Sequence, residues 1–246
     1  MHELPVKALS VDPANLNTAD VELICHCDDG QDYAVKTTTK NPHVPHSEWF
    51  CKHLGDRVGI ASPPCRLVEV NGLVGFGSRW ESGHKPGSWW MELQTGGAEK
   101  GRLLPTVNRI FAFDLFVNNI DRHGNNYLFR QQAGGWSLTA FDHSRAWLAV
   151  GWPLHSLPMG AHLNTVKMMR WLNATLGGIL DIGECMTVIN NLRSVDPKFI
   201  TQILDCQDPS WLSTHERDTI LMFWESSARQ KRLDEVERGL KNGNYL

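Results

Sequence analysis

The sequence predicts an α+β protein of two lobes: a small antiparallel β-sheet lobe with one helix, then a larger, mainly helical lobe. Over roughly the first 80 residues, short runs rich in β-branched and aromatic residues alternate with glycine turns, and from residue 106 onward apolar residues recur at helical spacing. Between them, residues 81–101 are rich in Gly, Pro and Ser and predict a connector with little regular structure. We therefore assign residues 1–82 to the small lobe and 83–246 to the larger one, both within one domain.

Composition narrows the classes of protein. The chain has 246 residues, of which 41% are hydrophobic and 21% charged, which is ordinary globular usage, and its formal net charge of -3 gives no electrostatic footprint for nucleic acid or an anionic membrane. The start "MHELPVKALSV" lacks a signal-peptide pattern, and no apolar run approaches the roughly 18 residues needed to span a bilayer. We expect a cytoplasmic protein that binds neither membrane nor nucleic acid directly.

The small lobe is predicted from its strands and turns. The turns "DDG" (28–30) and "NG" (71–72) suit hairpins, because glycine accepts a positive φ. One helix interrupts the strands over residues 47–59, with Ser47 as its cap and Gly59 at its end. The predicted strands are residues 6–11, 21–27, 31–38, 65–70 and 73–80.

The larger lobe reads as helices around one hairpin. The hairpin covers residues 126–144 and turns at "AGG". Asp196-Pro197 and Ser213 are helix start signals. Helical periodicity covers residues 106–117, 164–180, 196–204 and 213–240.

Six cysteines occur without a CxxC pair, which favours small buried residues over a zinc knuckle or a disulfide framework. An alternative keeps them as ligands: "CHC" (25–27) contains soft donors, and "HVPHSE" (43–48) contains His43, His46 and Glu48, which are able to hold zinc.

A dense polar cluster, "NNIDRHGNNYLF" (118–129), follows the apolar run "IFAFDLFV". Asp121 and Asn126 in this cluster have the spacing of the protein-kinase catalytic loop HRDxxxxN, in which the acid faces the substrate and the amide faces a metal. Asp, Asn and Gly also cluster in ordinary turns, so the spacing alone is weak. However, the hairpin should bring Asp142 back beside Asn126, close enough to share a cation.

Phosphoryl transfer also needs a lysine that reaches the phosphates. Lys36 lies in "YAVKT", which resembles the VAIK strand, and Glu48 on the next helix would be its partner. Taken singly, Lys36 reads as a solvated strand residue and Glu48 as an acid that the helix dipole favours. Their order along the chain with Asp121, Asn126 and Asp142 predicts a kinase-like site for ATP and magnesium.

The sequence resembles the HipA-like kinase family. The resemblance is carried by "FDLFVNNIDRHGNNYLF", "WSLTAFDHSRAWL", "YAVKTT" with the helix after it, and "ILDCQDPSWLSTHERDTILMFWESSARQKRLDEV", which is similar to the closing helices of compact, stand-alone members. It implies a protein-kinase-like fold with Asp121 as catalytic acid/base, Asn126 and Asp142 as magnesium ligands, Lys36 as ATP phosphate ligand and Glu48 as its ion-pair partner. The DRHxxN form also occurs in phosphatidylinositol kinases, so it does not choose the acceptor.

Neighbouring residues have less specific roles. His123, in the catalytic group, is expected to hold the loop geometry through hydrogen bonds rather than to move protons. Arg122 either stabilises phosphate charge or pairs with a nearby acid. Asp114, within the apolar helix, needs a polar partner because an unpaired buried carboxylate is costly.

One segment departs from the kinase pattern. The connection between the first two strands, "DPANLNTAD" (12–20), contains no glycine, although glycine lets backbone N–H groups approach phosphates closely. Either Asn15, Asn17 and Thr18 contribute side-chain contacts to the nucleotide, or the phosphates are held more loosely. Thr18 is also a candidate for self-phosphorylation.

The leading hypothesis is therefore an ATP- and magnesium-dependent kinase that phosphorylates a hydroxyl, most plausibly of a protein Ser or Thr, with an acceptor that the sequence does not identify. A rival is a nucleotide-binding pseudokinase or interaction module, in which Trp89 and Trp90 form a partner surface. A third is a small-molecule or lipid kinase. The resemblance leaves open a toxin–antitoxin context, with an antitoxin-like or regulatory protein as partner.

Overall fold

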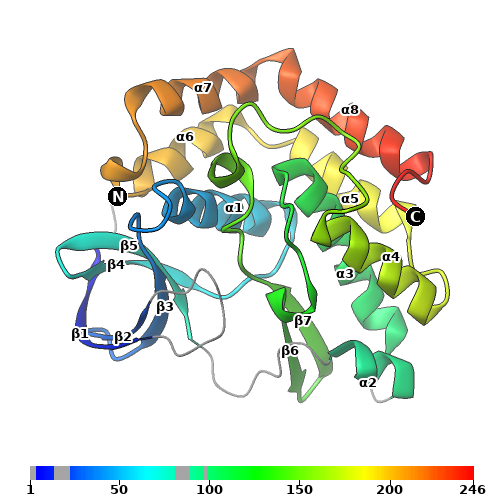
Figure 1. The fold of residues 1–246 in the computed structure, drawn as a ribbon, viewed down its shortest axis with the longest axis horizontal. Coiled ribbons are helices and arrows are strands. Elements are labelled where there is room, and N and C mark those ends of the chain that lie inside the picture. Colours follow the sequence, from blue (N-terminus) through cyan, green and yellow to red (C-terminus); the bar gives the residue numbers. More distant parts are fainter. Residues whose placement is uncertain (1–3, 14–22, 81–88, 97–98) are drawn as a thin grey trace.

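The chain forms a small β-barrel lobe and a larger helical lobe, with helix α1 (Val44–Val58) between the barrel and the other helices (Figure 1). The structure, a computed structural model, describes residues 4–13, 23–80, 89–96 and 99–246. The α+β fold class predicted from the sequence is confirmed. The predicted lobe boundary between residues 82 and 83 falls outside the described residues.

The strands of the small lobe lie in the order β1-β2-β3-β5-β4 and close into a barrel. Neighbouring strands are antiparallel, as predicted, except where β1 closes the barrel on β4 as a short parallel pair, with Val6 opposite Val68. Hairpin signals identify only antiparallel neighbours, so they did not predict this pair. The strands are β1 (Val6–Pro13), β2 (Leu23–Cys27), β3 (Asp32–Lys36), β4 (Cys65–Val70) and β5 (Leu73–Arg79).

The barrel interior is filled by side chains from alternate strand positions. Cys25 and Cys27 of β2 are fully buried there, beside Val35 and Val68. Burial raises the pKa of the Cys27 thiol to about 12, so this thiol stays protonated at neutral pH. The prediction that these cysteines are small buried residues is confirmed for this pair.

Helix α1 (Val44–Val58) begins earlier than predicted. Pro45 occupies the first turn, where a missing N–H is tolerated, so Ser47 lies inside the helix and is not its cap. The Ser47 hydroxyl instead accepts a hydrogen bond from the Ala149 backbone at 2.9 Å. Gly59 ends the helix at φ 89°, as predicted. Glu48 therefore lies on the second turn, not at the helix start.

The connector is more ordered than its composition suggested. Helix α2 (Trp89–Thr95) lies within the segment predicted to be irregular. Trp89 accounts for this helix. Its ring is fully buried, with its centroid 5.0 Å from that of Tyr127, and its Nε1 donates to the Gly124 carbonyl at 3.3 Å. This tertiary packing outweighs the loop-forming residues around it.

The predicted hairpin and the other predicted helices are present with shifted ends, whereas the helix Ile182–Arg193 and the short 3-10 helices were not predicted. Asp196 caps α6, and Ser213 with Glu216 forms a capping box at α7. The run predicted over residues 213–240 is two helices, because Ser226 ends α7 and caps α8. The elements are α3 (Lys100–Val117), η1 (Gly124–Asn126), β6 (Tyr127–Gln132), β7 (Gly135–Ala140), η2 (Trp147–Val150), α4 (Asn164–Leu176), α5 (Ile182–Arg193), α6 (Pro197–Cys206), η3 (Pro209–Trp211), α7 (Thr214–Glu225) and α8 (Ser227–Lys241).

Helix α3 is the centre of the helical lobe and packs against α4, α5, α8 and β7. Its last turn is held by Arg232 of α8, whose guanidinium donates to the carbonyls of Leu115 at 3.0 Å and Phe116 at 2.6 Å. A cation at this end of a helix also opposes the negative end of the helix dipole. The helix ends at Asn118 in the left-handed conformation (φ 57°), where the polar cluster begins.

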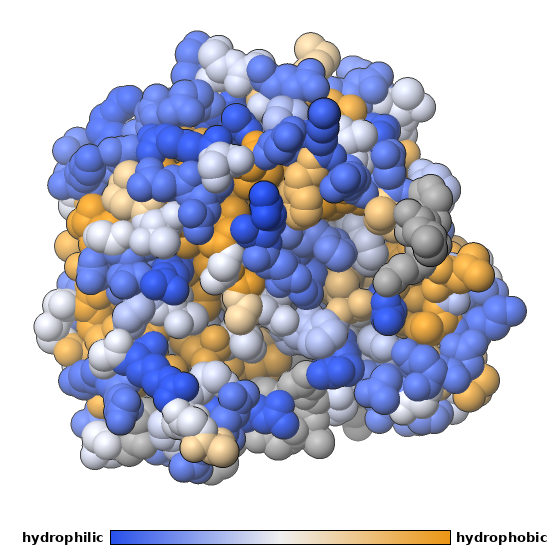
Figure 2. Space-filling view, turned by 180° about the vertical axis from the view of Figure 1, so that it is seen from behind, coloured by the Kyte–Doolittle hydropathy of each residue, from blue (hydrophilic) through white to orange (hydrophobic). Residues whose placement is uncertain are grey.

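The surface is typical of a folded domain. Figure 2 shows polar residues over most of one face, with apolar residues in separate patches between them. Within the described residues, none of the helices combines the length and apolar character that crossing a membrane requires.

Candidate active site

The site begins with Lys36, the last residue of β3, which the fold buries against two carboxylates. The Lys36 Nζ donates to Glu48 Oε1 at 2.5 Å and to Asp142 Oδ1 at 2.8 Å. Only 6% of Lys36 and 3% of Glu48 is exposed. Three elements far apart in the sequence, β3, α1 and the end of β7, thus meet at one ammonium group. The structure therefore brings together the predicted lysine, its predicted partner and the predicted metal ligand.

The pKa values of Lys36, Asp142 and Glu48 depend on one another. Burial alone would lower the pKa of Lys36, but the attraction of Asp142 and Glu48 outweighs it and raises that pKa above its usual range. Burial would raise the pKa of Asp142, but Lys36 and hydrogen bonds from Ser144 hold it well below its usual value. Burial, together with the charge of Asp142, raises the pKa of Glu48. Two carboxylates around one ammonium favour a further cation.

The loop from Asn118 to Asn126 carries the predicted catalytic acid. Asn119 connects it to α3: its amide donates to Asp114 Oδ1 at 2.9 Å, and its oxygen accepts from the Asp121 backbone at 3.2 Å. Asp121 is half-buried, and its Oδ1 accepts a hydrogen bond from Asn164 Nδ2 at 2.5 Å. The carboxylate is therefore held at a fixed rotation.

His123 contacts its own loop. Its Nδ1 accepts a hydrogen bond from the Asn125 backbone at 3.3 Å and caps the short helix η1. Its carbonyl accepts from the Asn126 backbone at 2.9 Å. These contacts match the expected role of holding the loop geometry.

Asn126 and Asp142 lie beside each other at the open end of the β6–β7 hairpin. Tyr127 pairs with Ala140, and the Phe141 backbone donates to the Asn126 carbonyl at 3.2 Å. Asn126 Nδ2 donates to the Asp121 carbonyl at 3.0 Å, so the amide nitrogen faces the loop and the oxygen is the natural ligand. A carboxylate and an amide oxygen suit magnesium, which typically uses one or two protein ligands and completes its shell with phosphates and water.

Beneath the loop lies a buried cluster that the sequence indicated only in part. Arg122 is 1% exposed and binds the fully buried Asp114 in a bidentate pair, Nε to Oδ2 at 2.7 Å and Nη2 to Oδ1 at 2.9 Å. Burial would lower the pKa of Arg122, but Asp114 outweighs it and raises that pKa. Of the two roles left open for Arg122, the geometry matches pairing with an acid. Asp114 thereby has the polar partner that was expected.

The same guanidinium joins the two loops of the site. Arg122 Nη1 donates to the Asn126 carbonyl at 2.9 Å and to the Phe141 carbonyl. Its Nη2 lies 3.1 Å from His143 Nε2. Burial and the nearby charge of Arg122 lower the pKa of His143 well below its usual value, so His143 is neutral and its Nε2 accepts. The Arg122 guanidinium thus holds the backbone of Asn126 and the two neighbours of Asp142 in place.

Sequence reasoning missed Asn164 and Thr165, which open α4. Thr165 Oγ1 donates to the Asn119 carbonyl at 2.5 Å and accepts from the Arg122 backbone at 3.0 Å. Asn and Thr near a helix start usually cap the helix, but the N-cap position here is Leu163. Their side chains bind the catalytic loop instead.

The other predicted residues either lie outside the described residues or lie elsewhere in the fold. Asn17 and Thr18 lie outside the described residues, as does Asn15. His46 is buried on α1 with its Nδ1 2.7 Å from Gln207 Oε1, and burial lowers its pKa to about 4. Within the described residues, His, Cys, Asp and Glu side chains form no group of three able to hold a metal, so the zinc alternative has no site there.

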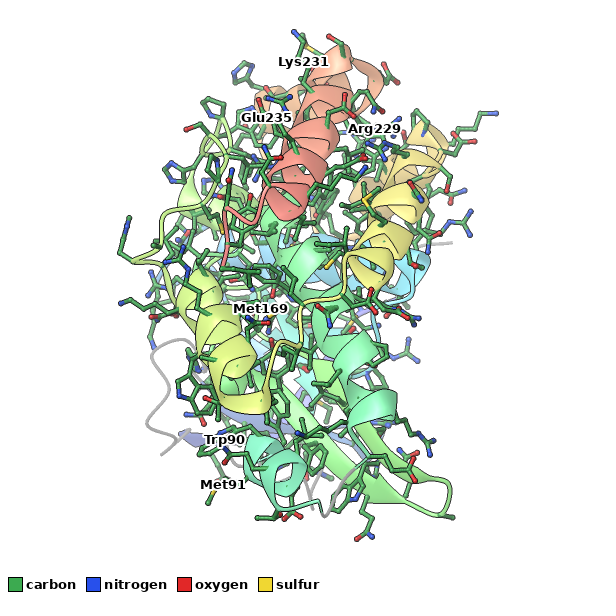
Figure 3. All side chains as sticks on the ribbon, turned by 90° about the vertical axis from the view of Figure 1, so that its right-hand side faces the viewer. Trp90, Met91, Met169, Arg229, Lys231 and Glu235 are labelled. Carbon is green, nitrogen blue, oxygen red and sulfur yellow. The ribbon has the colours of Figure 1, made fainter. Side chains whose placement is uncertain are left out.

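The two tryptophans proposed as a partner surface differ. Trp89 is fully buried, so it is not part of a surface. Trp90 is half-buried, with its ring 4.8 Å from that of Trp171 on α4, and Met91 beside it is 50% exposed (Figure 3).

Comparisons with solved structures agree with this fold. The fold resembles that of the Helicobacter pylori proinflammatory kinase CtkA, with a TM-score of 0.60 and 13% identity. The match covers 98% of this chain and all of that one. The fold also resembles that of Shewanella oneidensis HipA, solved with HipB and operator DNA, with a TM-score of 0.52 and 11% identity over 97% of this chain and 66% of that one. At these identities the similarity establishes the fold.

Sequence comparison identifies the family. No curated protein matches the chain. A family model described as HipA-like kinase matches residues 19–150, which is more than half of the chain and includes Lys36, Asp121 and Asp142. The chain belongs to the HipA-like kinase family.

Proposed function

We propose that this protein is an ATP- and magnesium-dependent phosphotransferase that moves the γ-phosphoryl group of ATP to a hydroxyl of Ser or Thr in a protein. The observation that supports it most directly is the meeting of Lys36, Glu48 and Asp142 beside a loop that presents Asp121 and Asn126. Phosphoryl transfer depends on positioning and charge stabilisation, and these groups are of the types that it requires.

Each residue has a proposed task. Lys36 binds the phosphates of ATP, and Glu48 keeps its ammonium in place. Asn126 and Asp142 are the magnesium ligands, and magnesium held there would neutralise charge on the phosphates. Asp121 orients the acceptor hydroxyl and accepts its proton. His123 supports the loop through the Asn125 backbone. Asn17 and Thr18 remain predicted contacts to the nucleotide.

The test is phosphate transfer from labelled ATP. The purified protein is incubated with [γ-³²P]ATP and magnesium in a lysate of its host, and the labelled molecules are identified. We expect labelled protein carrying phosphoserine or phosphothreonine with the wild-type chain and none with Asp121→Ala or Asp142→Asn. Full transfer by either variant would overturn the assignment.

The outcomes also separate the alternatives. Stabilisation by magnesium and ATP without ATP consumption would indicate a nucleotide-binding pseudokinase, which the glycine-free segment 12–20 motivates. Label in a lipid or a small molecule would indicate another acceptor class. An antitoxin-like or regulatory partner stays a prediction, motivated by the similarity to a HipA that was solved with HipB.

A further inference from the structure

The start of α4 holds the catalytic loop through two side chains. Asn164 and Thr165, 43 residues after Asp121 and Arg122 respectively, each bond to that loop. Thr165 uses its hydroxyl twice, toward the Asn119 carbonyl and from the Arg122 backbone, so it fixes the backbone on both sides of Asp121. Only Asn164 contacts the carboxylate among the hydrogen bonds of the described residues.

The contact distinguishes the two carboxylate oxygens. Oδ1 of Asp121 accepts from Asn164 Nδ2 at 2.5 Å, and this bond sets the rotation of the carboxylate about its last torsion angle. That torsion is broad and soft when nothing restrains it. With Oδ1 bonded to the Asn164 amide, Oδ2 remains for a second partner.

We propose that Asn164 is a positioning residue for Asp121, which holds Oδ1 so that Oδ2 receives the proton of the acceptor hydroxyl. This inference rests on the proposed phosphotransferase function. In the step concerned, the acceptor oxygen forms a bond to the γ-phosphorus, the bond from that phosphorus to the bridging oxygen of ADP breaks, and the acceptor proton moves to Asp121 Oδ2. ADP then leaves with the electron pair of the broken bond.

If Asn164 only supported the start of α4, the effects of a substitution on stability and on catalysis would run in parallel. Asn164 is the first residue of α4, and the first turn of α4 contains no acid. An aspartate at this position would interact favourably with the helix dipole, so Asn164→Asp should keep or strengthen the helix start. The same change removes the donor to Asp121 and places a second carboxylate beside it, so stability and catalysis should change in opposite directions.

The experiment compares Asn164→Ala and Asn164→Asp with wild type. Asn164 is exposed, so both variants are expected to fold. ATP turnover is measured with [γ-³²P]ATP, magnesium and dephosphorylated casein as the acceptor, counting both transfer and release of phosphate. We expect kcat to fall about tenfold for Asn164→Ala and about 100-fold for Asn164→Asp, with KM for ATP within about twofold of wild type, because misplaced catalytic groups cost up to about 100-fold.

A matched control makes the same kind of change away from the site. Ser227 is the exposed first residue of α8, and Ser227→Asp should leave kcat unchanged. Thermal unfolding is measured for all three variants. The inference is overturned if Asn164→Asp keeps at least half of the wild-type kcat, or if the losses in kcat follow losses in Tm.

Asp121→Ala and Asp142→Asn separate this failure from failure of the proposed function. If both variants stop turnover while Asn164→Asp does not, only the positioning role is wrong. If they turn over ATP like wild type, or if wild type consumes no ATP, the phosphotransferase assignment is wrong and the role of Asn164 falls with it.

Discussion

Lys36 and Asp142 are 106 residues apart in the sequence, and their Nζ and Oδ1 atoms lie 2.8 Å apart. Lys36 belongs to the barrel, whereas Asp142 follows the hairpin of the helical lobe. The ion pair therefore joins the two lobes, in addition to aligning groups within the site. Because Glu48 bonds to the same ammonium, removing Lys36 would leave the buried Glu48 and the partly buried Asp142 without their cation.

Lys36→Met should therefore destabilise the fold by about 3–5 kcal/mol, the usual cost of breaking a buried ion pair. The double variant Lys36→Met/Glu48→Gln should recover part of this loss, because it removes one of the two uncompensated charges. Urea unfolding measures both free energies, and the exposed Lys198→Met should change stability by less than about 0.5 kcal/mol. A double variant less stable than Lys36→Met would contradict the electrostatic explanation.

Nucleotide should stabilise the folded chain in a metal-dependent way. At 100 times its Kd, ATP with magnesium should add about 2.7 kcal/mol, which thermal unfolding detects as a rise in Tm. Asp142→Asn should keep the part of this rise seen with ATP and EDTA and lose the part that magnesium adds, whereas Lys36→Met should lose both. An equal magnesium effect in Asp142→Asn and wild type would exclude Asp142 as a ligand.

Much of the site could be predicted because its spacing is local. Asp121 and Asn126 lie in one loop, and the antiparallel register of a single hairpin returns Asp142 beside them. Lys36 and Glu48 are joined by one strand-to-helix connection. In each case the pattern within a short segment determines which residues meet.

The parts that were missed depend on tertiary packing. The contacts of Asn164 and Thr165 come from a helix that docks on the loop, and their polar side chains near a helix start are ambiguous in sequence. Helix α2 forms in a segment whose composition favours a loop, because burial of Trp89 against Tyr127 stabilises the helix. The Arg122 contacts to two carbonyls are likewise set by the hairpin and α3 together.

The Arg122 cluster can be tested by charge and by shape. Arg122→Gln leaves the fully buried Asp114 without a cation and should cost about 3–5 kcal/mol. Arg122→Lys keeps the charge, but one ammonium cannot bond the carboxylate and both carbonyls, so about 1–3 kcal/mol should be lost. Thermal and urea unfolding should rank wild type above Lys and Lys above Gln. Equal losses for the two variants would show that the charge on Arg122 is unimportant.

A pH dependence of stability should come from His46. Burial lowers the pKa of His46 to about 4, with a further decrease from His43 and opposing effects from its bond to Gln207 and from Glu216. In the unfolded chain the pKa returns to about 6.5, so between these values the unfolded state binds more protons than the folded state. The contribution of His46 is therefore complete above about pH 6.5 and is lost as the pH falls toward 4, by about 3 kcal/mol in total.

His46→Gln isolates this effect, because glutamine can still hydrogen-bond Gln207 but does not titrate. His143 is also buried and neutral, so it too lowers the stability of the fold as the pH falls. The His46→Gln variant should therefore retain part of the pH dependence. Urea unfolding between about pH 4.5 and 7.5, which covers most of the interval between the two pKa values, should show a shallower slope for His46→Gln. If stability changed equally with pH in the variant and in wild type, His46 would have to be protonated in the folded chain. Its burial on α1 against Gln207 makes that costly.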